Sequence, residues 1–210
     1  MKDNRLVPES ADPATARAEY EQKTAALVGQ IVLDVAYWDI HNFGDQPRTW
    51  DYGDWHHAVM GVELVTATGP VSVVWTDTFF PYGVEVFHGP ISDHLLLGPE
   101  GPEGWAVGSH PLWRSREGSP VLAATTVWER IEVGAAVRLS DNVQVAEPRA
   151  YDVPVGLRLD FAAGPVWMVA GMPQWPDVEK VFVPGDEIMV VFSAERMRKI
   201  GFPETAFTGQ

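Results

Sequence analysis

The segment from residue 37 to residue 55, YWDIHNFGDQPRTWDYGDW, interleaves aromatic rings with carboxylates. Aromatic side chains supply a large contact area at little cost in conformational entropy, and carboxylates beside them attract Arg and Lys side chains. Two alternatives remain open: the segment could bind a sugar, or its rings could point into a core while its acids cap turns. We predict a binding site for a basic protein partner here, formed by Asp39, Asp45, Trp50, Asp51, Tyr52, Asp54 and Trp55.

Histidines and acids gather in the first half of the chain. All six histidines lie within residues 41–110, and no Lys or Arg occurs between Arg48 and Arg114. This distribution indicates either a solvated acidic face or a functional face for a basic partner or a metal ion.

His56 and His57, followed by Glu63 and Gly69, resemble the metal-binding motif of cupins, which are β-barrels. Cupins separate their two histidines by one residue, whereas adjacent residues of a strand point to opposite faces. We therefore predict no metal ligands. A metal- or small-ligand-binding β-barrel enzyme that uses this His- and Asp-rich region remains the alternative function.

Signatures of common enzyme classes are missing from the sequence. It contains no G-x-x-x-x-G-K phosphate loop, no G-x-S-x-G elbow, no H-E-x-x-H motif and no G-x-G-x-x-G fingerprint. Two carboxylates from the set Asp39, Asp51, Asp54 and Asp77 could act as a glycosidase pair, but spacing along a chain does not give separation in space. We predict no catalytic residue and no cofactor.

Composition narrows the class of protein. The chain has 210 residues, 46% of them hydrophobic, a formal net charge of −14 and no cysteine. Thiolate chemistry and disulfides are therefore excluded, and nucleic acid is not expected as the ligand because phosphate contacts need clustered Lys and Arg. No stretch has the length and apolarity of a membrane span or a signal peptide, so we expect a cytoplasmic protein.

Capping residues predict a short helix near each end of the chain. Asp12 and Pro13 suit a helix start and Gly29 a helix end, and a second helix is expected from Ser193 to a point before Gly201. Strands are predicted at 30–37, 61–68, 71–75, 84–87, 94–97, 121–128, 131–139, 143–146, 156–161, 166–170, 178–183 and 187–192. The Gly- and Pro-rich stretch 98–111 is expected to form a loop without regular secondary structure.

Two segments resemble each other. GVELVTATGPVSVVW (61–75) aligns without gaps with GLRLDFAAGPVWMVA (156–170), and further matches follow at the same displacement. We infer a mainly β fold in which two similar antiparallel β-units pack as a sandwich or closed barrel. The predicted divisions are an N-terminal segment (1–29), a first β-unit with the acidic and aromatic loop (30–111) and a second β-unit (112–210).

These features favour an acidic protein-interaction module that binds and neutralises a basic protein, as an immunity protein does for a toxin. An assembly protein that uses exposed sheet edges is a further alternative. The oligomeric state does not follow from the sequence.

Overall fold

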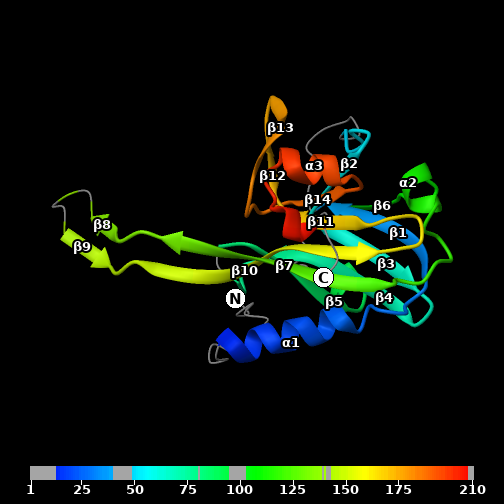
Figure 1. Ribbon diagram of the computed structural model, residues 1–210, viewed down its shortest axis with the longest axis horizontal. Coiled ribbons are helices and arrows are strands. Elements are labelled where there is room, and N and C mark those ends of the chain that lie inside the picture. Colours follow the sequence, from blue (N-terminus) through cyan, green and yellow to red (C-terminus); the bar gives the residue numbers. More distant parts are fainter. Residues whose placement is uncertain are drawn as a thin grey trace.

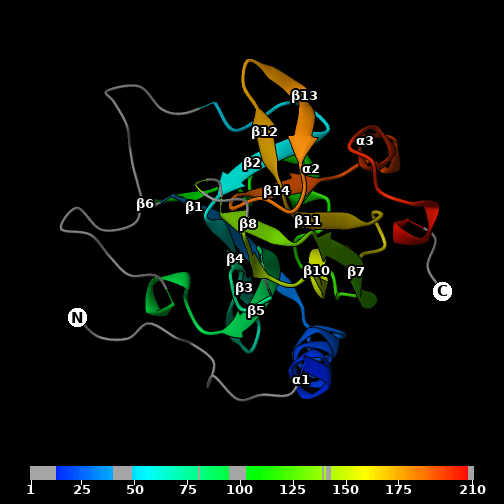
Figure 2. The same ribbon diagram turned by 90° about the vertical axis from the view of Figure 1, so that its left-hand side faces the viewer.

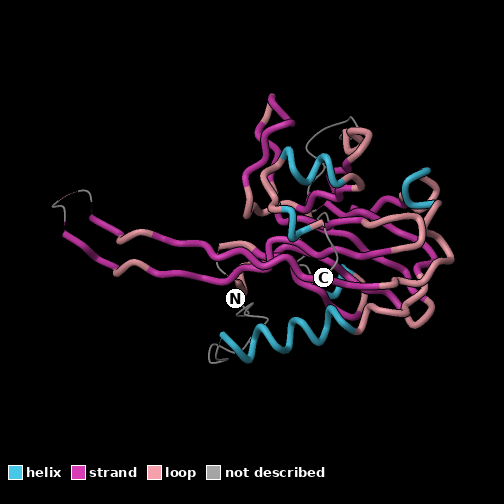
Figure 3. The backbone as a smooth tube through the Cα atoms, viewed as in Figure 1, coloured by secondary structure: helices cyan, strands magenta, loops and turns pink. Residues whose placement is uncertain are grey.

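The computed structural model of the chain describes residues 13–39, 49–79, 81–94, 103–138, 140 and 143–207. Strands dominate the architecture, and the helices lie at its margins (Figures 1 and 3). The predicted mainly β fold with short N-terminal and C-terminal helices is confirmed. Among the described residues, no helix combines the length and apolarity that crossing a membrane requires.

One curled, mixed sheet forms the body of the molecule. Its strands follow the order β5-β4-β3-β1-β2-β14-β11-β10-β7, with β6 as an additional partner of β1. The β1–β2 pair is parallel, and the other pairs of this sheet are antiparallel. The strands are β1 (Val32–Asp39), β2 (Trp55–Val59), β3 (Gly61–Thr66), β4 (Gly69–Thr76), β5 (Gly83–His88), β6 (Glu103–Ala106), β7 (Ala123–Val133), β10 (Arg149–Asp160), β11 (Val166–Ala170) and β14 (Ile188–Val191).

Two further strand pairs extend from the sheet. β8 (Ala136–Arg138) pairs with β9 (Val143–Ala146) at the end of a long ribbon formed by β7 and β10, which projects from the body (Figure 1). β12 (Met172–Gln174) pairs with β13 (Asp177–Phe182) in a short hairpin that stands beside the last helix in both views (Figures 1 and 2). Most residues of β9, β12 and β13 in these two projections are exposed.

The central strands are buried on both faces, which explains their unbroken apolar runs. In β11, Val166, Met168 and Ala170 belong to one core cluster, which also contains residues of β1, β3, β4 and β5. The alternate residues Trp167 and Val169 belong to a second cluster on the other face. Residues from both halves of the chain thus share the first core.

Both predicted helices are present. α1 (Pro13–Ala25) precedes Gly29, whose φ of +84° suits the left-handed conformation that follows a helix. α3 (Ala194–Lys199) begins after Ser193, whose side chain accepts a hydrogen bond from the Arg196 N–H at 3.0 Å. The other helical segments are α2 (Pro111–Arg114) and the 3₁₀ turns η1 (Ile91–Asp93) and η2 (Glu204–Ala206).

The internal resemblance corresponds to two hairpins with the same register. Gly61 pairs with Val74 in β3–β4, and the matching residues Gly156 and Val169 pair in β10–β11. The correspondence does not extend to the third strand, because β5 pairs with β4 whereas the matching strand β13 pairs with β12. A duplicated unit, and the packing of two such units as a sandwich or closed barrel, are therefore not confirmed.

Two local expectations are corrected, and a third lies mainly outside the described residues. Glu103–Ala106 forms strand β6 within the stretch expected to be a loop, because Gly104 lets the backbone approach Trp38; a Cβ there would lie 2.9 Å from the Trp38 ring. β7 runs unbroken through Glu129 and Arg130, since charged side chains suit a strand that is exposed there. Residues 91–93 form a 3₁₀ turn, and the strand expected at 94–97 lies mainly outside the described residues.

Candidate functional site

A partly buried polar cluster lies where β1, β2 and α2 meet. We call it the His56 cluster, and its members are Tyr37, Asp51, His56, His110 and Trp113. Tyr37 comes from β1, His56 from β2 and Trp113 from α2, while Asp51 precedes β2 and pairs with His56 in an isolated β-bridge. His110 is the residue immediately before α2. Segments far apart in the sequence therefore build one site.

A chain of hydrogen bonds fixes the proton positions inside this cluster. The Trp113 Nε1–H donates to the Tyr37 hydroxyl oxygen at 2.6 Å, and that oxygen lies 2.7 Å from His56 Nδ1. Because an indole nitrogen only donates, the arrangement that satisfies all three groups has Tyr37 donating its own proton to His56. His56 then carries its proton on Nε2.

The Nε2 atom of His56 has no hydrogen-bond partner among the described residues, although the side chain is completely buried. It faces Asp51, whose Oδ1 lies 3.7 Å away. His110 approaches the same carboxylate, with Nε2 at 3.3 Å from Oδ2, while its Nδ1 accepts the Leu112 N–H over a long 3.4 Å. Two imidazole Nε2 atoms thus converge on one carboxylate.

Burial sets the charges in this cluster. It lowers the pKa of His56 to about 4, and the neighbouring His110 acts in the same direction while Asp51 opposes it. The pKa of Asp51 is lowered, chiefly because the Gly53 N–H donates to its Oδ1 at 2.8 Å. At neutral pH the cluster therefore presents a neutral His56 beside an ionised Asp51.

Aromatic rings enclose His56. Trp50 meets it edge-on with ring centroids 4.9 Å apart, and Phe192 does so at 4.8 Å. The His110 ring is perpendicular to it, with centroids 4.5 Å apart. The imidazole is held in one orientation, and solvent reaches the cluster from the side of Asp51, whose side chain is 45% exposed.

The adjacent histidine points to the opposite face, as expected for neighbouring strand residues. His57 Nε2 lies 2.8 Å from Glu187 Oε2, away from the His56 cluster. Glu63, the acid of the cupin-like pattern, instead accepts the Ile91 N–H at 2.8 Å. These three residues do not form one site. Within the described ranges, Asp51, His56 and His110 are the one trio of His and acidic side chains whose ligand atoms all lie within 4.8 Å of one another.

The predicted partner-binding residues have different positions. Trp55 is completely buried and Asp39 is 7% exposed, so neither offers a surface contact, and Trp50 is half-buried against the core. Tyr52 stacks on Trp55 with centroids 4.2 Å apart. Asp45 lies outside the described residues. The accessible members of the set are Asp51, Tyr52 and Asp54, and their role in partner binding stays a prediction.

Asp54 takes part in a structural ion-pair network. Arg196, only 6% exposed, donates to Asp54 Oδ1 at 3.1 and 3.2 Å and to Glu179 at 2.6 and 3.2 Å. Burial acts to lower the pKa of Arg196, but the hydrogen bonds to both carboxylates outweigh it and raise the pKa. The network fastens the loop before β2 and the β12–β13 hairpin to α3.

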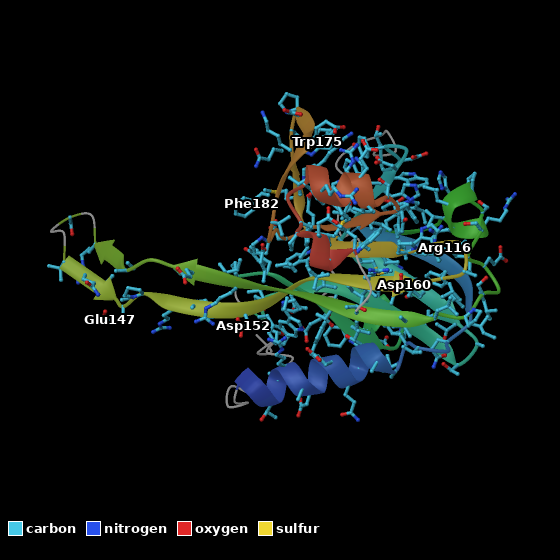
Figure 4. The ribbon with its side chains drawn as sticks, in the orientation of Figure 1. Arg116, Glu147, Asp152, Asp160, Trp175 and Phe182 are labelled. Carbon is cyan, nitrogen blue, oxygen red and sulfur yellow. The ribbon has the colours of Figure 1, made fainter. Side chains whose placement is uncertain are left out.

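The β12–β13 hairpin is a second candidate site. Trp175 is 59% exposed, Phe182 53% and Met172 37%. Trp175 and Phe182 are the exposed large aromatic side chains of the described part of the chain. Figure 4 shows Trp175 at the tip of the hairpin and Phe182 directed away from the body. The Trp175 ring also lies 6.1 Å from that of Tyr52, beside the predicted loop.

A pocket of about 160 Å³ opens between this hairpin, the base of the ribbon and the end of α3. Its lining is more polar than apolar, includes a single carboxylate, and consists of Glu129, Val181, Val183, Ile200, Gly201 and Phe202. The sequence interpretation missed both the hairpin and the pocket. The available signal was a tryptophan within the turn-forming residues MPQWPD at 172–177.

Comparison of the chain with protein-family models, with curated proteins and with solved structures found no match. Function is therefore inferred from the geometry of the two candidate sites.

Proposed function

We propose that this chain is an acidic protein-binding module whose partner is a basic protein, and that the β12–β13 hairpin and its adjoining pocket make the contact. The observation that carries the proposal is the exposure of Trp175 and Phe182 beside a pocket that contains one carboxylate. A basic enzyme or toxin that is neutralised when this surface covers it would fit, as in an immunity protein.

Exposed aromatic side chains on a short hairpin are suited to anchoring a protein partner. Trp and Tyr side chains dominate measured interface energies because they bury a large area in fixed orientations. The hairpin is itself held in place, since Glu179 on β13 binds the buried Arg196. A rigid platform reduces the entropy that is lost on binding.

The pocket beside the hairpin suits a Lys or Arg side chain of the partner. Val181, Val183 and Phe202 can pack against the aliphatic part of such a side chain. The Glu129 carboxylate can then pair with its charged group. This pairing gives the pocket a preference for a basic rather than an apolar or acidic partner.

The negative charge around the hairpin also favours a basic partner. Residues 172–187 contain four carboxylates and one lysine, and the whole chain has a formal net charge of −14. Such a field raises the rate at which a basic protein associates and makes that rate fall with salt.

Variants that affect only this surface test the proposal. Proteins captured from the host lysate by the wild-type chain are compared with those captured by Trp175→Ala/Phe182→Ala and by Glu129→Gln. The matched control is Glu132→Gln, which changes the same chemical group on the same strand but on the opposite face, because residues 129 and 132 alternate across β7.

We expect a basic protein whose affinity falls at least about tenfold with either change at the hairpin or pocket and is unaffected by Glu132→Gln. Its association with the wild-type chain should slow as salt is raised. Capture of the same proteins by all variants, an acidic partner, or association that is independent of salt would each refute the proposal.

A further inference from the structure

We propose that Asp51, His56 and His110 form a binding site for a divalent transition-metal cation of the Zn²⁺ class. Two imidazole nitrogens and one carboxylate oxygen are a donor set that zinc and its neighbours prefer. The site is separate from the partner surface proposed above, and it does not depend on that function.

The three donor atoms already lie close together. His110 Nε2 is 3.3 Å and His56 Nε2 3.7 Å from the Asp51 carboxylate, and the ligand atoms of the three residues are all within 4.8 Å of one another. Ligand atoms around one tetrahedral ion lie roughly 3.3 Å apart, given metal–ligand bonds of about 2 Å. Small side-chain movements therefore bring all three to one ion.

A second observation points independently to a ligand. His56 Nε2 is aimed into the cluster from a completely buried side chain and has no hydrogen-bond partner among the described residues. A buried polar atom without a partner costs free energy, and a metal ion in front of it would remove that cost. His57 cannot compete for this ion, because it points to the opposite face and binds Glu187.

The surroundings orient two of the three ligands. Tyr37 holds His56 through Nδ1 at 2.7 Å, and the Gly53 N–H holds Asp51 at 2.8 Å. Exposure of the Asp51 side chain gives the cation a route from solvent and leaves room for water to complete its coordination.

Metal binding moves a proton on each ring. As the side chains stand, the hydrogen bonds at Nδ1 place the protons of both imidazoles on Nε2. A cation on Nε2 requires both protons on Nδ1, so Tyr37 must accept from His56 and the long contact between His110 and the Leu112 N–H is lost. Because these hydrogen bonds must be exchanged or lost, we expect moderate rather than extreme affinity for the cation. The shift of each ring proton from Nε2 to Nδ1 is a signature of binding that can be measured.

Calorimetric titration of the chelator-treated full chain with Zn²⁺ alone tests the proposal. We expect one site of micromolar or tighter affinity, weakened at least about tenfold in both His110→Gln and Asp51→Asn. These two side chains are partly exposed, so their replacement leaves the buried His56 and its core intact. His88→Gln, which removes an exposed histidine from β5, is the matched control and should bind as the wild type does.

Nitrogen NMR of the imidazoles supplies a readout that general destabilisation does not produce. Zn²⁺ should shift His56 Nε2 and His110 Nε2 and transfer the remaining proton of each ring to Nδ1. Support requires weakening in both cluster variants, none in His88→Gln, and this change of tautomer. Any other pattern, including Zn²⁺ held equally by all variants or no binding below millimolar concentration, overturns the proposal.

Discussion

Tyr37 is the central member of a hydrogen-bond chain, and its hydroxyl group should contribute strongly to stability. In Tyr37→Phe, the indole N–H of Trp113 and the Nδ1 atom of His56 both lose their partner. Trp113 is 1% exposed and His56 is completely buried, so water does not replace the missing hydroxyl. The change therefore leaves two buried polar groups unsatisfied.

The expected destabilisation follows from the loss of a partner by the Trp113 N–H and by His56 Nδ1. Each buried donor or acceptor left without a partner costs about 1–3 kcal/mol, and the lost hydroxyl adds little cavity volume. We expect Tyr37→Phe to lower the free energy of unfolding by about 3 kcal/mol, measured by urea denaturation followed by far-UV circular dichroism.

Tyr20 provides a matched control within the same chain. It is 2% exposed, but its hydroxyl has no well-formed hydrogen bond to a described residue, and burial raises its pKa. Tyr20→Phe removes the same atom from a comparable environment and should be neutral or stabilising by up to about 1 kcal/mol. If the two variants differ by less than about 1 kcal/mol, the hydrogen-bond chain through Tyr37 does not stabilise the fold as we infer.

Three further substitutions test other parts of the structure. Arg196→Met removes a buried cation from two partly exposed carboxylates and should cost about 2 kcal/mol in urea denaturation, an effect that high salt reduces. Gly61→Ala would place a Cβ 2.7 Å from the backbone oxygen of Val73, so we expect a loss of about 1–3 kcal/mol and a lower melting temperature. Ser193→Ala removes the N-cap of α3 and should cost about 1 kcal/mol, with faster amide exchange confined to that helix. If any of the three substitutions leaves the free energy of unfolding unchanged, the contact that it removes or crowds does not act as we infer.

Local chemistry predicted the parts of the fold that depend on neighbouring residues. Ser193 identified the start of α3 because a capping side chain bonds a backbone group three residues away. The β3–β4 turn followed from Gly69, whose φ is +131°. The opposite orientation of His56 and His57 followed from the geometry of a strand alone.

The candidate sites could not be predicted because they depend on contacts distant in the sequence. Nothing in the spacing of Asp51 and His110 shows that their side chains meet; the curl of the sheet and the position of α2 bring them together. Trp55 was assigned to a binding surface because aromatic residues serve equally in cores and interfaces, and only the packed structure shows that it is buried. Whether Trp175 is exposed likewise depends on contacts distant in the sequence, and only the packed structure shows it.

Conversely, similarity of sequence overstated similarity of structure. Matching glycines and valines specify the hairpins β3–β4 and β10–β11, which have the same register. The third strand of each segment depends on contacts outside the hairpin, and those differ: β5 joins β4, whereas its counterpart in the sequence, β13, joins β12. A shared turn sequence therefore fixes a hairpin but not the sheet around it.

The ribbon formed by β7 and β10 has a consequence for how this fold can evolve. Beyond the pair formed by Val133 and Arg149, the described side chains of its outer part are almost all exposed, and Figure 4 places Glu147 near its far end. Strand pairing rather than core packing sets its length, so residues can be gained or lost in equal numbers on the two strands. Insertions and deletions among homologues should therefore accumulate between residues 133 and 149, while the lengths of the central strands stay constant.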